Sequence, residues 1–275
     1  MIVDAHLHVF LSTADDPDRT VDAIAPPDRS APIELLEETM SAHGVEAAVL
    51  VPLGPEDAYV SRVVQGDPTR FAGIGVWDGE QDPGVVADRL AGAGMRGLRM
   101  FGFPDGIPWQ VLERLAADRL LLWLYPRPDD VEHVHEVCRR LPDLQIVLNH
   151  TGLTQGGIGV DDQLRPRIES AIPQPTEGRV RDLAAYPQVS VILSGAYGFS
   201  HEPWPYPDIG EVTRRVADAF GTERLMWASD FPWILDDPGY GRMLELVDQH
   251  LPGLLESERT AVLGGNARRI VWEES

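Results

Sequence analysis

The chain is 275 residues long and strongly acidic, with 44 acidic and 23 basic residues and a formal net charge of −21. Such a charge repels phosphate backbones and anionic lipid surfaces, so we expect neither nucleic-acid nor membrane partners. The hydrophobic content of 43% supplies a large core and excludes a disordered chain.

Eight short apolar runs, rich in Val, Ile and Leu, follow one another along the chain. From the second to the sixth, they begin about 25 residues apart, which is the length of one strand plus one crossover helix. They barely alternate in polarity, as is typical of buried parallel strands. The runs are Ile2–Phe10, Val45–Leu53, Arg70–Trp77, Met95–Phe101, Leu120–Pro126, Gln145–His150, Val189–Gly195 and Arg224–Asp230.

Amphipathic segments lie between these runs, where crossover helices belong. A barrel of eight strand–helix units needs about 250 residues. The sequence therefore predicts an α/β fold, a single-domain (β/α)8 TIM barrel over residues 1–275. The expected helices are Ile33–His43, Pro83–Ala93, Pro108–Asp118, Asp129–Leu141, Asp208–Phe220 and Gly239–His250.

Two connections are long, Leu11–Pro32 and Thr151–Pro187. Both follow the carboxyl ends of predicted strands, where barrel enzymes carry their functional loops. The chain shows neither a signal-peptide pattern at its beginning nor an apolar run of the ~20 residues that a membrane span needs. We therefore expect a cytoplasmic protein, and the sequence leaves its oligomeric state open.

The absence of lysine and the presence of a single cysteine exclude several kinds of catalytic and metal site. Every basic residue is an arginine, so the chain offers no lysine for a Schiff base or for a carbamate that bridges two metals. Cys138 is the one cysteine, which excludes a disulfide framework and a thiolate cluster.

Polar residues interrupt three of the apolar runs near their ends. His6 and His8 are two apart in the first run, so they share a strand face and can converge on one metal ion or one water. His150 ends the sixth run and Asp230 the eighth, at the same predicted rim. Internally hydrogen-bonded core groups are the alternative, but polar groups in a barrel core are costly without partners. A carboxylate at this rim could bind a metal or take a proton from water.

Four motifs in order carry a family resemblance: DAHLHVF, LNHTG, WASDFPW and GGNARRIV. Together, over Ile2–Trp272, they resemble the amidohydrolase-related (amidohydrolase 2) branch of the amidohydrolase superfamily. That branch includes 2-pyrone-4,6-dicarboxylate lactonases, sugar lactonases and decarboxylases. The resemblance implies a barrel hydrolase in which the reacting centre is surrounded by His6, His8, His150 and Asp230.

The fifth run departs from the decarboxylase pattern. The resemblance implies a metal-binding histidine at the end of that strand in decarboxylases, where LLLWLYPRP places Tyr125. In this respect the chain is similar to the lactonases, in which a tyrosine helps to hold the substrate carbonyl and catalysis can proceed without metal. We expect one divalent metal, Zn²⁺ by its ligand set, at weak or absent occupancy. Its ligands would be His6, His8, His150 and Asp230.

Five further residues are candidates for substrate contact. Arg99 shares a strand face with Gly97 and Phe101, and an arginine at the rim suits a carboxylate or a lactone oxygen. An ion pair with a neighbouring acid is the alternative role for Arg99. The other candidates are Arg127, Ser194, Tyr197 and Trp233.

The resulting hypothesis is hydrolysis of a lactone or related ester of a small anionic substrate. Asp230 would activate water, while His150, Tyr125 and Arg99 would stabilise the oxyanion. A metal-dependent decarboxylase of an aromatic or dienyl acid and a non-catalytic barrel that binds a small acid are the alternatives.

Overall fold

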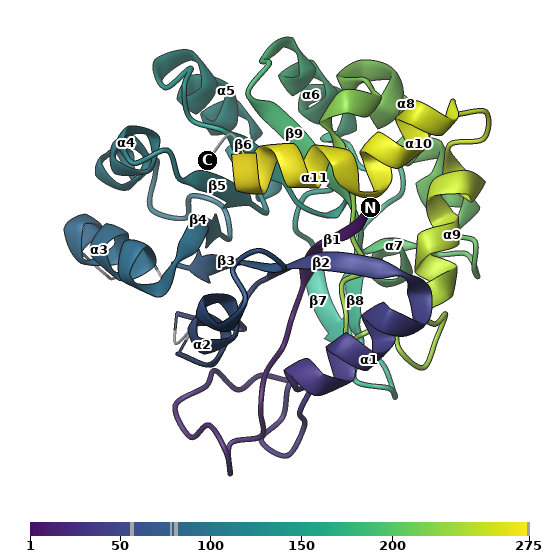
Figure 1. The fold of residues 1–275 in the computed structure, drawn as a ribbon. Coiled ribbons are helices and arrows are strands. Elements are labelled where there is room, and N and C mark those ends of the chain that lie inside the picture. Colours follow the sequence, from purple (N-terminus) through teal and green to yellow (C-terminus); the bar gives the residue numbers. More distant parts are fainter. Residues whose placement is uncertain (56–57, 78, 80–81, 274–275) are drawn as a thin grey trace.

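Eight parallel strands form one sheet in the computed structural model, which describes residues 1–55, 58–77, 79 and 82–273. The strand order follows the sequence, and the sheet curls into a nearly closed barrel with helices around it (Figure 1). This confirms the predicted TIM-barrel fold. The strands are β1 (Ile2–Leu7), β2 (Val45–Leu50), β3 (Phe71–Val76), β4 (Met95–Met100), β5 (Leu121–Leu124), β6 (Ile146–Leu148), β9 (Val189–Leu193) and β10 (Leu225–Trp227).

The helices bury apolar stripes against the outside of this sheet. In α5, Val131, Val134, Val137 and Cys138 are all buried, at the spacing of one helical face. Five of the helices given below, α2, α6, α7, α10 and α11, were not predicted. The helices are α1 (Ile33–His43), α2 (Ala58–Gly66), α3 (Pro83–Ala93), α4 (Trp109–Ala117), α5 (Val131–Arg140), α6 (Glu177–Asp182), α7 (Ala196–Phe199), α8 (Pro207–Phe220), α9 (Tyr240–His250), α10 (Glu256–Thr260) and α11 (Asn266–Arg268).

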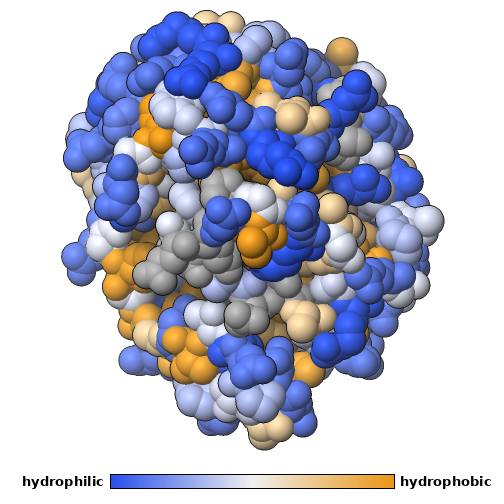
Figure 2. All heavy atoms as spheres, turned by 90° about the vertical axis from the view of Figure 1, so that its left-hand side faces the viewer, coloured by the Kyte–Doolittle hydropathy of each residue, from blue (hydrophilic) through white to orange (hydrophobic). Residues whose placement is uncertain are grey.

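One side of the helical ring presents a mainly hydrophilic surface (Figure 2). Figure 2 shows the face that carries α3 and α4, where hydrophobic residues lie singly or in small groups among polar ones. This agrees with the acidic composition. No helix in the described part of the chain is long and apolar enough to cross a membrane.

An irregularity in β1 aims the two histidines inward. Asp4 pairs with Ala48 of β2 but Leu7 pairs with Leu50, so β1 takes three steps where β2 takes two. Val3 and Ala5 lie in the barrel interior, whereas Leu7 packs in the outer layer beneath the helices. The bulge thus moves His6 and His8 to the inner face, and bulges commonly re-aim side chains beside functional sites.

The barrel closes between β1 and the segment that follows β10. The Asp230 amide donates to the His6 carbonyl at 3.1 Å, and the His8 amide donates to the Phe231 carbonyl at 2.8 Å. Asp4 supports this seam: its carboxylate accepts from the Ser229 amide at 2.9 Å and from the Tyr240 hydroxyl at 2.7 Å. Burial raises the pKa of Asp4 to about 6, against the opposing effect of these hydrogen bonds.

The carboxyl-terminal segment covers the amino-terminal end of the barrel, in front of the chain's start in Figure 1. Gly264 lies directly on β1, where a Cβ would stand 2.6 Å from the Met1 carbonyl oxygen. The side-chain amide of Asn266 donates to the backbone carbonyls of Thr222 and of Leu225, the first residue of β10. The GGNARRIV motif is therefore explained by close packing and by hydrogen bonding at the end opposite the predicted site.

Replacing Gly264 with Ala should lower the free energy of unfolding by about 1–3 kcal/mol, the usual cost of overpacking a tight site. Gly265→Ala is the matched control, because a Cβ there would approach the Thr260 carbonyl oxygen no closer than 3.6 Å. Urea unfolding followed by circular dichroism measures both changes. Equal stability of the two variants would contradict the packing described for Gly264.

Candidate functional site

A cavity of about 330 Å³ opens at the carboxyl ends of the strands, within the range of about 300–1,000 Å³ usual for small-molecule sites. The two long connections border it, as expected: the first through Asp22 and Ile24, the second through a hairpin of β7 (Gly157–Val160) and β8 (Pro166–Glu169). This hairpin was not predicted. The polar residues of the floor come from separate strand ends: His8, Arg99, Tyr125, His150, Tyr197 and Asp230.

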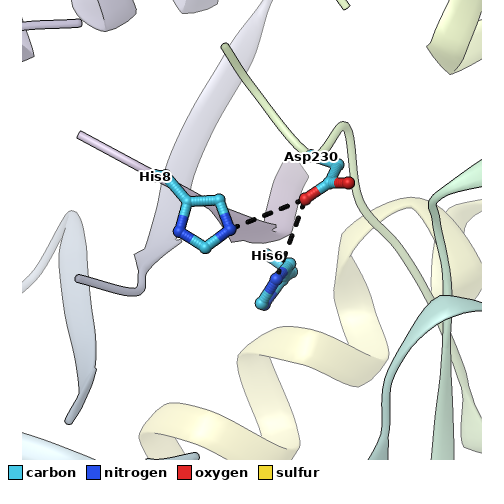
Figure 3. Close-up of side chains that lie close together, drawn as sticks. All are labelled: His6, His8 and Asp230. Carbon is cyan, nitrogen blue, oxygen red and sulfur yellow. Dashed lines mark ion pairs between the residues drawn. The ribbon is translucent and has the colours of Figure 1, made fainter. Parts of the chain in front are cut away.

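His6, His8 and Asp230 converge at the seam of the barrel (Figure 3). One carboxylate oxygen of Asp230 lies 3.8 Å from Nε2 of His6 and 3.7 Å from Nε2 of His8. These separations are too long for direct hydrogen bonds. They leave room for a small bridging group between the three atoms.

The two histidines carry opposite tautomers. The indole N–H of Trp123 donates to Nδ1 of His6 at 3.0 Å. Since an indole nitrogen is only a donor, Nδ1 of neutral His6 is bare and its proton is on Nε2. Nδ1 of His8 lies 2.8 Å from the carbonyl oxygen of Val51, so it carries the proton and Nε2 of His8 keeps its lone pair.

Burial keeps the imidazoles uncharged. It lowers the pKa of His8 to about 3 and that of His6 and His150 well below the usual value, and the positive charge of Arg99 acts in the same direction. Burial also raises the pKa of Asp230 to about 6, although the Tyr197 hydroxyl, which donates to its second oxygen at 2.7 Å, opposes the shift. Above pH 6, Asp230 is therefore an ionised base beside neutral imidazoles.

His150 follows β6 with a positive φ of 50°. Its Nδ1 lies 3.1 Å from the hydroxyl oxygen of Ser194. Gly195 leaves the space that the ring occupies, because a Cβ there would stand 2.7 Å from Nδ1. The ring also packs edge-on against Tyr125, with centroids 4.9 Å apart.

Arg99 and Tyr125 present donors that the described protein atoms do not use. The Nε of Arg99 and the hydroxyl of Tyr125 are buried without a hydrogen-bond partner. Burial lowers the pKa of Arg99 to about 10, which leaves it charged at neutral pH. Both side chains face the cavity, so a bound carbonyl or carboxylate oxygen would satisfy them.

The other predicted contacts divide into two groups. Tyr197 and Trp233 line the cavity. Ser194 is buried behind His150 instead, which suits a positioning role better than substrate contact. The side chain of Arg127 is exposed and outside the cavity lining, because the chain turns away after Tyr125 and the Arg127 amide is bound to Asp130. The structure does not support its predicted substrate contact.

Sequence reasoning missed Trp123 and Asp4. Trp123 points into the barrel interior two residues before Tyr125, so strand alternation counted back from Tyr125 would have indicated it. Asp4 begins the DAHLH motif, but its partners lie more than two hundred positions away and no local pattern indicates them.

Comparison with known proteins agrees with this geometry. The model of an amidohydrolase family matches residues 3–271. The chain belongs to this family. An L-fucono-1,5-lactonase of Burkholderia ambifaria is 27% identical, with 96% of this chain and 93% of that protein covered.

Solved structures support the fold. One assigned as a 2-pyrone-4,6-dicarboxylic acid hydrolase from Pseudomonas putida superposes with a TM-score of 0.78 at 23% identity, covering 98% of this chain and 97% of that one. An amidohydrolase from Burkholderia multivorans with bound zinc has a TM-score of 0.76 at 22% identity, covering 98% and 99%.

The histidine pair and Asp230 could also hold a divalent cation. Their ligand atoms lie within 4.8 Å of one another, Nε2 of His6 has no hydrogen-bond partner among the described atoms, and two nitrogens with a carboxylate suit Zn²⁺. A bound cation would act as a Lewis acid and lower the pKa of water. The predicted fourth ligand, His150, is outside this set, with its ring centroid 5.7 Å from that of His6.

Replacing Tyr197 with Phe should raise the pKa of Asp230 above 6 by about one unit, because the carboxylate loses the hydrogen bond that favours its charged form. Carbon-13 NMR of labelled aspartate side chains measures the titration. Tyr240→Phe is the matched control: it removes the equivalent bond to Asp4 and should raise only the pKa of that residue. An unshifted Asp230 titration in Tyr197→Phe would refute this coupling.

Proposed function

We propose that the protein hydrolyses the ring ester of a lactone, a small-molecule substrate, with a water molecule held between His6, His8 and Asp230. The main support is the hydrogen-bonding character of the three atoms that face one another. Nε2 of His6 is an N–H donor, Nε2 of His8 has a free lone pair, and Asp230 offers a carboxylate oxygen. Water can accept from His6 and donate to both His8 and Asp230, which satisfies every group at once. The L-fucono-1,5-lactonase relative supports the choice of substrate class.

In the proposed reaction, Asp230 takes a proton as the water oxygen bonds to the lactone carbonyl carbon. The negative charge that forms on the carbonyl oxygen is stabilised by Arg99 and by the Tyr125 hydroxyl, with His150 beside them. The bond to the ring oxygen then breaks, and the proton on Asp230 passes to that oxygen. The product is an open-chain hydroxy acid.

We infer that metal occupancy is weak. A cation at Nε2 of His6 requires a lone pair there, and His6 can supply it only by moving its proton to Nδ1 and giving up the hydrogen bond from Trp123. Tyr125 also replaces the histidine that the decarboxylase alternative requires. Both features favour hydrolysis over metal-dependent decarboxylation.

Asp230→Asn should reduce kcat by about a thousandfold or more, since it removes the base and leaves a similar shape. Asp22→Asn is the control, because Asp22 lines the cavity mouth and its backbone-capping oxygen is retained in Asn. Hydrolysis of L-fucono-1,5-lactone, monitored by the release of protons, measures both variants. Near-normal turnover by Asp230→Asn would exclude this residue as the base.

The activity of the unchanged protein should also depend on pH. It should fall as the pH drops through about 6, where Asp230 becomes protonated.

Trp123→Phe should increase zinc affinity by about tenfold, the equivalent of one hydrogen bond of about 1.4 kcal/mol. Competition with a chelating dye measures the affinity, and nitrogen-15 NMR of the histidine rings reports the tautomer of His6. Trp227→Phe is the control, since this buried indole donates to the Met243 carbonyl instead. Tight zinc binding by the unchanged protein, with His6 protonated on Nδ1, would contradict the tautomer proposed here.

A further inference from the structure

The cavity joins a polar floor to an apolar roof. The hairpin β7–β8 covers the floor groups and presents Ile158, Val160 and Ile168 to the cavity. Ile158 remains 64% exposed although it lines the cavity, so part of its apolar surface is free to contact a ligand. The other large apolar lining residues are Ile24, Leu53, Phe101, Phe199 and Trp233.

Two arginines, Arg29 and Arg165, hold the hairpin over the mouth of the cavity. Arg29 donates to the Leu164 carbonyl at 2.7 Å and stacks over Trp233. Arg165 is paired with Asp161 and Asp237, at 2.8 and 2.7 Å. Both cations therefore hold the hairpin, and neither belongs to the cavity lining.

The charges that reach the cavity leave one place for an anion or a carbonyl oxygen. Among the described lining residues, Arg99 is the one arginine, and the acids are Asp22 and Asp230. When the lactone carbonyl occupies this place, a carboxylate elsewhere on the substrate would lose its hydration without gaining a cation. Several sugar hydroxyls under the roof would lose hydrogen bonds to water in the same way, at about 1–3 kcal/mol for each group left unsatisfied.

We propose that the natural lactone carries a hydrocarbon substituent and no anionic group, with its ring carbonyl at Arg99 and Tyr125 and its substituent under Ile158 and Ile168. This inference rests on the proposed lactone hydrolysis and specifies its substrate. It separates this chain from what its relatives' names describe, a sugar lactone and a pyrone dicarboxylate.

Three lactones test the substrate class. δ-Decalactone and L-fucono-1,5-lactone share a six-membered ring but carry a pentyl chain and hydroxyl groups, respectively, and 2-pyrone-4,6-dicarboxylate adds two charges. We expect kcat/KM for δ-decalactone to exceed the other two values by about tenfold or more. Preference for the sugar lactone or the dicarboxylate would overturn the substrate class and leave lactone hydrolysis standing.

The roof itself is tested by Ile158→Asn. This change should lower kcat/KM for δ-decalactone by about tenfold, mainly through KM, and leave that for L-fucono-1,5-lactone equal or higher. Leu255→Asn is the matched control, because Leu255 is 67% exposed but outside the cavity lining. An equal loss on both lactones would refute a hydrocarbon contact at Ile158.

Binding separates a failure of this inference from a failure of the proposed function. If no lactone is hydrolysed, lactone hydrolysis is wrong. Asp230→Asn protein then reports ligand preference through the change in its total tryptophan fluorescence on binding, to which Trp233 in the cavity lining contributes. Tighter binding of δ-decalactone than of L-fucono-1,5-lactone supports the apolar class, and equal or weaker binding overturns it.

Discussion

The seam between β1 and the segment after β10 is the constraint on which the site depends. Two backbone hydrogen bonds, from Asp230 to His6 and from His8 to Phe231, close the barrel where the regular strand ladder has ended. The hydrogen bonds that close the barrel therefore also place the Asp230 carboxylate beside both histidines. Asp4, buried beside them, holds both sides of the seam through Ser229 and Tyr240.

Burial also sets the protonation states on which the proposed hydrolysis depends. In a dry interior an uncharged imidazole is favoured over an imidazolium, and the nearby Arg99 adds to this preference. Because the histidines are neutral, their single protons are placed by their neighbours: Trp123 on one side and the Val51 carbonyl on the other. The result is a donor and an acceptor facing the same carboxylate oxygen, which an apolar or fully charged trio could not provide.

The regular spacing of the apolar runs made the barrel predictable from the sequence. The arrangement of the site side chains depends on contacts between distant strands, so it could not be predicted in the same way. The spacing of the apolar runs located all eight strands, and the placement of polar residues at strand ends brought His8, His150 and Asp230 to one cavity. The bulge in β1, the tautomer of His6 and the seam bonds depend on partners from other strands, which no local pattern shows. Arg127 was chosen for its position just past Tyr125, but the chain turns away there and leaves its side chain exposed outside the cavity lining.

The floor and the roof of the cavity come from different parts of the chain, and this division explains how one barrel can keep its chemistry while its substrate changes. Floor residues sit at strand ends, whose positions the closed sheet fixes. Roof residues sit on the inserted hairpin and the first long connection, which Arg29 and Arg165 fasten from outside the cavity. A loop can change its side chains without disturbing the strands beneath it. In the proposed function, the reaction thus depends on the sheet, and the choice of lactone depends on the loops above it.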